Sequence, residues 1–378
     1  MGAAVKFFLV AGEPSGDRLG AALMSGLKTL SPGVTFEGVA GPLMQAEGMG
    51  SLFPMEELSV MGIAEILPKY FKLLARIRET AEAVLASGAQ ALITIDSPDF
   101  CLRVARLVKE KRPEIKVIHY VAPSVWAWRP GRAAKMAQVV DHVLALLPFE
   151  PPYMTAAGMT CDFVGHPVVA EPVATAQEIQ QFQGDGPLIL ALPGSRRGEV
   201  SRLAPVLGQV LAQVKAAHPQ ARVALPTVRG VADLAADLTA DWPICPEIII
   251  DPTRKRAAFA VADVALAASG TVSLELASNF CPMVIAYKLH PISFWLMKRA
   301  ALIDTVTLVN LVSETRAVPE FLGPDCHAEV IAPALLDLLQ DSPRRQAQLS
   351  AMALTMQRLG QGGEPPGLRA ARSVLGAI

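Results

Sequence analysis

The 378-residue sequence lacks an excess of charge of either sign, because 34 Lys and Arg residues stand against 35 Asp and Glu residues, for a formal net charge of -1. A protein built to bind nucleic acid depends on surplus Lys and Arg against the phosphates, so this balance argues against that class. The same balance leaves no polybasic tail that would hold an anionic membrane by charge alone.

Long apolar runs and paired cysteines are also missing. No window of about 18 residues is free of charges and helix breakers, so we expect no transmembrane helix. The N-terminal apolar stretch runs directly into a Gly-rich turn, unlike a signal peptide. The five cysteines are scattered without a C-x-x-C pair, which is typical of reduced thiols in a cytoplasmic protein. No D-x-D triplet and no histidine pair with metal-ligand spacing occur, so we expect neither a metal ion nor another cofactor.

Apolar residues make up 52% of the chain and charged residues 18%, which supplies large buried cores and excludes disorder. Short β-rich apolar runs alternate with helical patterns, as in a parallel sheet covered by helices on both faces. The predicted strands are 6–10, 34–39, 91–95, 116–121, 142–147 and 162–164, then 188–192, 222–225, 247–250, 264–267 and 283–287. From Ala328 onward the pattern is helical. The predicted fold class is therefore α/β and doubly wound.

The pattern restarts once, which predicts two Rossmann-like domains. Residues 1–167 form the first domain and residues 168–344 the second, with a Pro- and Gln-containing linker after Gly165-His166-Pro167. The C-terminal helices, at about 345–378, are expected to pack back on the first domain. Two such domains leave a central cleft between them, where ligands of this architecture bind.

Ligands of open parallel sheets bind beyond the carboxyl ends of the strands, so the strand-to-helix turns are candidate sites. The first turn, AGEPSGD at 11–17, brings two glycines and free helix N–H groups toward an anion or a sugar hydroxyl. It is not G-x-G-x-x-G, which disfavours a nicotinamide dinucleotide. Alternatively, Ser15 or Asp17 only caps the helix. The candidate binding residues of this turn are Gly12, Glu13, Ser15, Gly16 and Asp17.

Asp96 directly follows the predicted strand 91–95 and could accept a proton from a hydroxyl nucleophile. The alternative is that Asp96 or Ser97 caps the helix that Pro98 begins.

The loop 122–129 contains Ser124, Trp126, Trp128 and Arg129. Its two indoles either form an aromatic wall for a sugar ring, with Ser124 and Trp126 as binding residues, or pack under the loop.

Two turns of the second half suit a nucleotide diphosphate. In LPGSRRGEV at 192–200, backbone donors converge at a helix start beside a guanidinium, while the G-K-[ST] ending of an ATP-binding P-loop is absent. In ASGTVSLE at 268–275, Glu275 could accept two ribose hydroxyls or only favour the helix N-terminus. The candidate residues are Gly194, Ser195, Arg196, Ser269, Gly270, Thr271 and Glu275.

The segment between Ile63 and Ile77 is apolar and carries Lys69, Lys72 and Arg76, with a single acid. Such a cationic amphipathic helix could lie in a membrane interface, or it could be an ordinary helix with its apolar face inward. FWLMKR at 294–299 is a second segment of this kind.

Together the strings resemble one family, the lipid-A-disaccharide synthases, bacterial glycosyltransferases of outer-membrane lipid A assembly. The resemblance covers most of the chain and is far more specific than any single motif. The matching strings are AGEPSGD (11–17), GVAGPLMQAEG (38–48), MEELSVMGIAEIL (55–67), IDSPDF (95–100), HYVAPSVWAWRPGR (119–132), LPFE (147–150), GHP (165–167), LPGSRRGEV (192–200), ASGTVSLE (268–275) and CPMVIAYKLHPISFW (281–295).

The resemblance implies a GT-B fold, with the acceptor site in the first half and the UDP-sugar site in the second. It implies transfer of 2,3-diacylglucosamine from its UDP donor to the 6-hydroxyl of 2,3-diacylglucosamine 1-phosphate (lipid X), giving a β-1,6-linked disaccharide 1-phosphate and UDP. It also implies a homodimer in the cytoplasm, peripherally attached to the inner membrane, with the helix between Ile63 and Ile77 as the membrane candidate.

By position, Asp96 matches the family's proposed general base and Arg196 matches an arginine of the UDP side. Ser195, Ser269, Thr271 and Glu275 fall in strings that the family uses for the nucleotide, and Asn310 falls in another. The chain departs from many members at Pro14, Ser97 and Val309, where Ala, Ala and Pro are common. Whether Asp99 shares the role of Asp96 stays open.

The resemblance and the turns predict an inverting displacement with Asp96 as the base. The rival enzymes are other GT-B sugar-nucleotide proteins, such as a polyprenyl-linked glycosyltransferase or a UDP-sugar 2-epimerase. A rival from another class is a non-catalytic protein that binds a UDP-sugar or a lipid.

Overall fold

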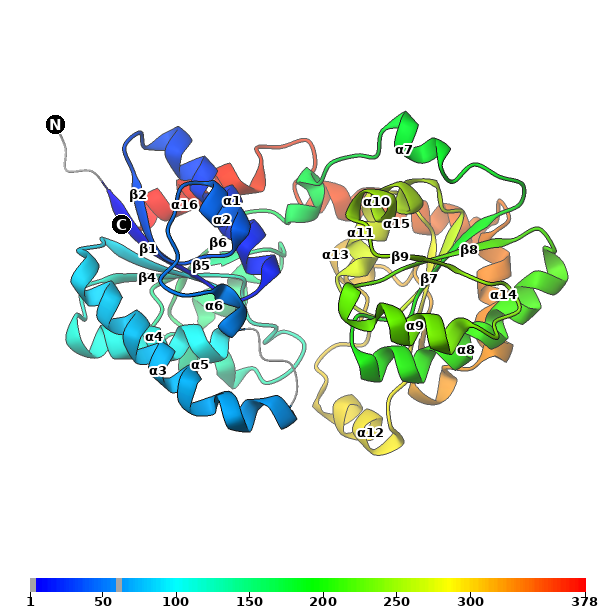
Figure 1. Cartoon of the computed structure of the whole chain (residues 1–378), viewed down its shortest axis with the longest axis horizontal. Coiled ribbons are helices and arrows are strands. Elements are labelled where there is room, and N and C mark those ends of the chain that lie inside the picture. The colour runs from blue at the N-terminus through cyan, green and yellow to red at the C-terminus, as the bar shows by residue number, and fades with distance from the viewer. Residues whose placement is uncertain (1–4, 59–62) are drawn as a thin grey trace. The chain divides into compact units, whose positions relative to one another are not determined.

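The computed structural model describes residues 5–58 and 63–378, with the side chains of 63–70 and 291–293 excepted. It divides into two units (Figure 1): unit 1 is Met1–Ala170 with Gly362–Ile378, and unit 2 is Glu171–Gln361. The first boundary lies three residues beyond the 167/168 position that the sequence predicts.

Unit 1 contains a six-stranded parallel sheet in the order β2-β1-β3-β4-β5-β6. Its strands are β1 (Lys6–Ala11), β2 (Thr35–Val39), β3 (Ala91–Ile95), β4 (Lys116–Tyr120), β5 (His142–Ala145) and β6 (Thr160–Phe163). Its helices are α1 (Pro14–Leu30), α2 (Pro42–Ala46), η1 (Met55–Glu57), α3 (Ile63–Ser87), α4 (Pro98–Lys111), α5 (Gly131–Met136), α6 (Pro151–Ala156), η2 (Pro167–Ala170) and α16 (Pro366–Ala377).

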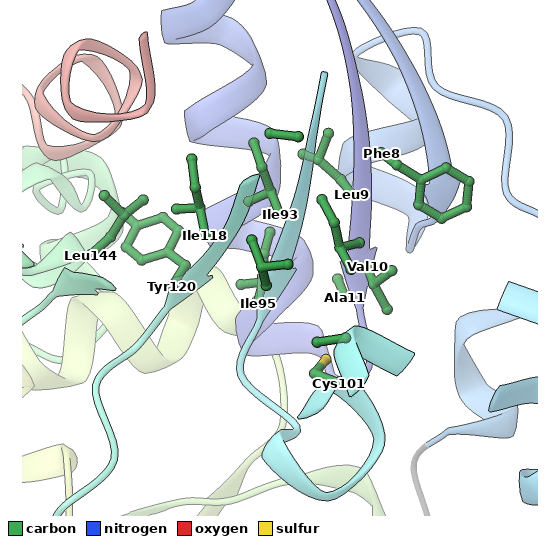
Figure 2. Close-up of a cluster of buried hydrophobic side chains, with 14 of the residues drawn as sticks. Phe8, Leu9, Val10, Ala11, Ile93, Ile95, Cys101, Ile118, Tyr120 and Leu144 are labelled. Carbon is green, nitrogen blue, oxygen red and sulfur yellow. The ribbon is translucent and has the colours of Figure 1, made fainter. Parts of the chain in front are cut away.

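The central strands of this sheet are buried along nearly their whole length, because helices cover both faces. Figure 2 shows the resulting core, with Leu9 of β1 beside Ile93 of β3, and Ile118 and Tyr120 on β4. Continuous apolar runs such as Phe7–Val10 are therefore buried on both sides of the sheet, as the sequence pattern indicates.

Unit 2 repeats the plan with a parallel sheet in the order β12-β11-β10-β7-β8-β9. Its strands are β7 (Leu188–Leu192), β8 (Arg222–Pro226), β9 (Glu247–Ile249), β10 (Val264–Ala267), β11 (Met283–Tyr287) and β12 (Glu320–Leu322). Its helices are α7 (Ala176–Gln180), α8 (Arg197–Ala217), η3 (Arg229–Val231), α9 (Ala232–Thr239), α10 (Pro252–Val261), α11 (Val272–Ser278), α12 (Pro291–Ala300), α13 (Leu308–Ser313), η4 (Gly323–Asp325), α14 (Ala328–Leu338) and α15 (Pro343–Arg358).

The α/β doubly wound class and all eleven predicted strands are confirmed. The sequence missed β12, which has only three residues and pairs in parallel with β11 at the sheet edge. The segment that returns to unit 1 contains α16, whereas α15 belongs to unit 2. The returning segment is therefore shorter than the predicted range of about 345–378.

Candidate functional site

The carboxyl ends of β1, β3 and β4 bring the candidate groups of unit 1 together. Ala11 pairs with Ile95, and Ile95 pairs with Tyr120, so the turns after these strands share one edge of the sheet. A Cβ atom added to Gly12 would lie 2.4 Å from Ser97 Oγ. Only glycine lets the first turn pass this close to the second, so these two turns are in direct contact.

Asp96 and Ser97 both adopt the left-handed backbone conformation, with φ of 54° and 44°. This conformation is costly for residues that carry a Cβ, and such strain is concentrated at functional sites. The Asp96 N–H donates to the Tyr120 carbonyl at 3.0 Å, which extends the sheet ladder and supports the strained turn. Among the described residues, no hydrogen bond or ion pair engages the half-buried Asp96 carboxylate. The carboxylate is therefore available to a bound hydroxyl.

Helix capping does not account for this turn. Ser97 stands at the N-cap of α4, but its hydroxyl makes no capping hydrogen bond, and Asp99 is exposed in the first helical turn. Cys101 lies under the end of β3 (Figure 2), where burial, with a smaller contribution from the Asp96 charge, raises the pKa of its thiol. The thiol therefore stays protonated and is not a nucleophile.

Asp17 has a structural role in the first turn. Its two carboxylate oxygens accept the N–H groups of Leu43 and Met44, each at 2.9 Å, at the start of α2. Asp17 is buried, so it holds a neighbouring helix rather than capping its own. Glu13, the N-cap of α1, and Ser15 are exposed at the turn, and a Cβ on Gly16 would lie 3.3 Å from the Ile95 carbonyl oxygen.

The two tryptophans of the loop 122–129 differ in environment. Trp126 is only 9% exposed, packs edge-on against Phe149 and donates from Nε1 to Glu150 Oε1 at 3.3 Å. Trp128 is 42% exposed, with the Arg129 guanidinium 4.2 Å above its ring. The packed interpretation therefore holds for Trp126, whereas the exposed aromatic surface at this loop belongs to Trp128.

Glu150 is a buried carboxyl that supports this loop. Besides Trp126, it accepts the N–H groups of Leu146 at 3.1 Å and Leu147 at 3.0 Å. Burial raises the pKa of Glu150 to about 7, although the three hydrogen bonds act in the opposite direction. In the sequence, LPFE is one of the strings shared with the family, and no local pattern indicates a role for Glu150.

In unit 2, Ala267 of β10 pairs with Leu192 of β7, so the turns at Gly194 and Gly270 are neighbours. Gly194 has φ of 113°, and a Cβ there would lie 2.6 Å from Glu199 Oε2. Glu199 folds back from the first turn of α8 onto this turn. Its carboxylate accepts the Ser195 N–H at 3.3 Å and pairs with the Arg196 guanidinium at 3.0 Å.

The Glu199 carboxylate thus occupies a backbone N–H and a guanidinium, two groups that can also bind phosphate oxygens. Arg196 is exposed, so its side chain is free to exchange Glu199 for a ligand.

The second turn of unit 2 places Gly270, with φ of 153°, and Thr271 at the exposed start of α11. The Ser269 hydroxyl lies 3.5 Å from the Val306 carbonyl oxygen. Glu275 forms an ion pair with Lys255 of α10 at 2.6 Å. Lys255 is a cation beside the predicted nucleotide turn that sequence reasoning missed, because the two residues lie 20 positions apart without a shared motif.

Asn310 is only 1% exposed, and its side-chain amide is fully occupied. Nδ2 donates to Thr305 Oγ1 at 3.2 Å and to the Val318 carbonyl at 2.9 Å, while Oδ1 accepts the Val318 N–H at 3.0 Å. Glu320 accepts the N–H groups of Val306 at 3.0 Å and Thr307 at 2.7 Å. Both residues hold the segment beside Ser269, a role that the sequence did not reveal for Glu320.

The basic residues of α3 are largely paired. Lys72 lies 3.1 Å from Glu57, and Arg76 lies 2.8 Å from Glu57 and 2.6 Å from Glu79. Ile77 is buried. The side chains of 63–70, including Ile63 and Lys69, lie outside the described residues.

In the parts of the chain that the structure describes, no group of three or more His, Cys, Asp or Glu side chains is placed to hold a metal ion. The described helices also include none with the length and apolar character needed to span a membrane.

The chain is similar to known proteins over nearly its whole length. Residues 7–364 match the family model described as lipid-A-disaccharide synthetase. The lipid-A-disaccharide synthase of Ruegeria pomeroyi is 60% identical over 99% of this chain and 96% of that protein. The lipid-A-disaccharide synthase of Rhodospirillum centenum is 46% identical over 98% of this chain and 94% of that protein.

Solved structures share the architecture at low identity. MurG of Acinetobacter baumannii superposes with a TM-score of 0.58 at 17% identity, over 99% of each chain. The UDP-GlcNAc 2-epimerase of Neisseria meningitidis, solved with UDP-GlcNAc, gives a TM-score of 0.65 at 11% identity, over 99% of this chain and 98% of that one. At such identities the likeness establishes the fold alone, which is the GT-B arrangement of two Rossmann-like units.

Proposed function

The chain belongs to the lipid-A-disaccharide synthetase family, and from that membership we propose how its two groups of turns perform the reaction. It is a glycosyltransferase of lipid A biosynthesis. The donor is UDP-2,3-diacylglucosamine, and the acceptor is 2,3-diacylglucosamine 1-phosphate. The products are the β-1,6-linked disaccharide 1-phosphate and UDP.

Asp96 is the general base in this proposal. Its carboxylate accepts the proton of the acceptor 6-hydroxyl while that oxygen attacks the donor's anomeric carbon from the face opposite UDP. The anomeric C–O bond breaks, and UDP leaves with the electron pair, so the configuration inverts from α to β. The observation that supports this role is a partially exposed carboxylate without a partner among the described residues, in a strained turn at the carboxyl edge of the unit 1 sheet.

The turns at Gly194 and Gly270 bind the UDP moiety in this proposal. Arg196 and the Ser195 N–H release Glu199 and bind the diphosphate, which offsets the negative charge that develops as UDP departs. Ser269 and Thr271 contribute hydroxyls, and Glu275 accepts the ribose hydroxyls. Asn310 acts indirectly, by holding the segment beside Ser269.

The acceptor lies against the turns of unit 1 in this proposal. Glu13 and Ser15 provide the exposed part of the first turn, and the buried Gly12 and Gly16 let that turn pack closely against Ser97 and Ile95. Ser124 and Trp128 provide the exposed part of the loop 122–129. The buried Asp17 and Trp126 stabilise these turns through their hydrogen bonds to Leu43 N–H and to Glu150.

The test is UDP release from UDP-2,3-diacylglucosamine, measured with and without lipid X and with excess chelator, together with mass analysis of the lipid product. The expected result is UDP release that requires lipid X, yields the disaccharide and is unaffected by chelator. The fold is also that of UDP-sugar 2-epimerases, so conversion of the UDP-sugar without lipid X would contradict the proposal in favour of that reaction. Binding of UDP without any turnover would favour a binding protein.

Peripheral attachment to the inner membrane is part of the proposal, because both substrates carry acyl chains. A homodimer is proposed from the family resemblance. The helix α3 offers the exposed Phe71 as a membrane contact. Sedimentation of the purified chain measures the oligomeric state, and a monomer at all concentrations would remove the dimer.

A further inference from the structure

Three consecutive side chains of α12 and one residue just beyond the helix are apolar and exposed on unit 2. Trp295 is 56% exposed, Leu296 55% and Met297 44%, and Leu302 just beyond the helix is 60% exposed. Scattered exposed apolar residues are ordinary, but four large ones within eight positions are not. Figure 1 shows α12 projecting from unit 2, away from its sheet.

Among the described side chains of α12, Phe294 contacts the body of unit 2. Phe294 lies against η4, where a Cβ added to Gly323 would be 2.6 Å from the Phe294 ring. Gly323 also has φ of 58°, so this position suits glycine for two reasons. Phe294 thus faces the body of unit 2, while the three residues after it face solvent.

Along the sequence, the charged residues of α12 and its flanks are all basic up to Asp304. No Asp or Glu occurs between Glu275 and Asp304, whereas Lys288, Lys298 and Arg299 fall within that stretch. Among the described residues, no carboxylate pairs with any of these three cations. The Arg299 guanidinium lies 5.1 Å above the Trp295 ring, so a cation and an indole share one surface.

This distinguishes α12 from α3, whose Lys72 pairs with Glu57 and whose Arg76 pairs with Glu57 and Glu79. Indole rings beside Lys and Arg are typical of the boundary between lipid headgroups and acyl chains, where the ring is half-buried and the cation meets phosphate.

We propose that Trp295, Leu296, Met297 and Leu302, with Lys288, Lys298 and Arg299, form a docking surface for an anionic phospholipid bilayer. The apolar side chains enter the acyl boundary, and the three cations contact lipid phosphates. The inference extends the proposed membrane attachment to a site on unit 2, and it does not depend on the catalytic assignment.

The experiment is co-sedimentation of the full chain with vesicles of phosphatidylethanolamine and phosphatidylglycerol, compared with vesicles of phosphatidylcholine. The expected result is binding to the anionic vesicles. The triple variant Trp295→Ser, Leu296→Ser, Met297→Ser is expected to weaken that binding at least tenfold. The double variant Lys298→Glu, Arg299→Glu is expected to abolish the preference for anionic vesicles, because each cation contributes about fivefold at such a surface.

Matched controls come from the same unit. Val228→Ser with Ile250→Ser removes two side chains that are each 49% exposed, and Arg344→Glu reverses an exposed charge. Both controls are expected to bind vesicles like the unchanged chain. UDP affinity verifies that each α12 variant is folded, since α12 carries none of the residues proposed to bind UDP.

Unchanged vesicle binding in both α12 variants, with UDP affinity retained, would overturn the proposal. A shift from dimer to monomer without a change in vesicle binding would instead identify a contact between copies of the chain. A raised KM for detergent-dispersed lipid substrates, again with unchanged vesicle binding, would identify an acyl-chain site. Failure of the UDP-release reaction would refute the catalytic proposal while leaving the vesicle result intact.

Discussion

Asp96, Ser97 and Val121 hold positive φ values of 54°, 44° and 86° at the carboxyl edge of the unit 1 sheet. Val121 is β-branched, so its conformation is unusually costly, and its N–H is held by the Leu144 carbonyl at 3.0 Å. Neighbouring strands thus impose the strain through backbone hydrogen bonds. The Asp96 carboxylate is placed by the sheet rather than by a side-chain partner.

Replacing Asp96 with Asn is expected to lower kcat by at least 100-fold, because the amide cannot accept the hydroxyl proton. UDP affinity is expected to stay within about twofold, since Asp96 and the UDP turns lie in different units. Steady-state kinetics with lipid X and titration with UDP measure the two quantities. Asp99→Asn, measured in parallel, tests whether the neighbouring carboxylate shares the role, and near-normal turnover of the Asp96 variant would remove Asp96 as the base.

Replacing Arg196 with Ala is expected to weaken UDP binding by about 1.5–3 kcal/mol, the range for a charge-assisted hydrogen bond. The exposure of Arg196 favours the lower end, because solvent screens its charge. Titration calorimetry with UDP measures the change, and Arg344→Ala is the control for an exposed arginine. Equal UDP affinity in both variants would contradict the assignment.

The raised pKa of Glu150 predicts that the stability of the protein depends on pH. Burial raises the pKa of Glu150 in the folded protein to about 7, above the ordinary 4.5 of a glutamate. Its contribution to the free energy of unfolding is therefore full below pH 4.5 and is lost as the pH rises through 7. The variant Glu150→Gln is therefore expected to gain up to about 3 kcal/mol relative to the unchanged chain between pH 5 and 8.

Denaturant unfolding at several pH values tests this. Burial lowers the pKa of His119 and His166 to about 4, so each residue lowers the free energy of unfolding of the protein as the pH falls below 6.5. This histidine effect occurs in the Glu150→Gln variant and in the unchanged protein alike, so it cancels in the difference between their free energies of unfolding. Parallel stability curves for the two chains would contradict the raised pKa of Glu150.

At the scale of elements, α1 packs closely against α16. A Cβ on Gly26 would lie 2.5 Å from the Gly367 carbonyl oxygen, and one on Gly367 would lie 2.5 Å from the Ala22 carbonyl oxygen. Glycine costs helix stability, so these positions are explained by the contact between backbones and not by helix propensity.

Replacing Gly26 with Ala is expected to lower the free energy of unfolding by about 1–3 kcal/mol, because backbone atoms cannot move aside as a flexible side chain can. Gly376→Ala in α16 is the control, since nothing lies within 4 Å of its added Cβ. Helix propensity predicts that this control is neutral or slightly stabilising. Chemical denaturation compares the two, and a stabilised Gly26 variant would show that α16 moves away easily.

At the scale of the molecule, the chain leaves unit 1 after Ala170 and returns to it at Gly362. The returning α16 contributes buried side chains such as Val374. Ser373 shares a 2.7 Å hydrogen bond with His142, and Arg369 donates to the Phe163 carbonyl at 2.7 Å. Unit 1 is therefore assembled from both ends of the sequence.

Deleting residues 362–378 is expected to destabilise unit 1 while leaving the UDP affinity of unit 2 unchanged, because every residue proposed to bind UDP lies in 171–361. Hydrogen exchange measures protection in each unit, with UDP titration in parallel. Lost protection in unit 2, or equal protection in unit 1 before and after the deletion, would contradict this assembly.

Both sheets, their strands and the turns that carry the candidate groups could be predicted from the sequence. The strand β12 could not, because the three residues Glu320–Leu322 are too short for a pattern. The site was predicted as a set of positions, of which Asp96, Arg196 and Thr271 are at least partly accessible. Asp17, Trp126 and Asn310 were predicted as binding residues, and the structure engages each in hydrogen bonds within its own unit.

The sequence by itself determined the alternation of buried strands and helices, since apolar periodicity and turn residues act over a few neighbouring positions. The sequence also contains the strings that identify the family. Only the tertiary structure decided which side chains are free, because partners such as Lys255 and Glu275 are far apart in sequence and meet through sheet order and helix packing. The same holds for α12, whose exposure depends on how Phe294 contacts Gly323 and not on its composition.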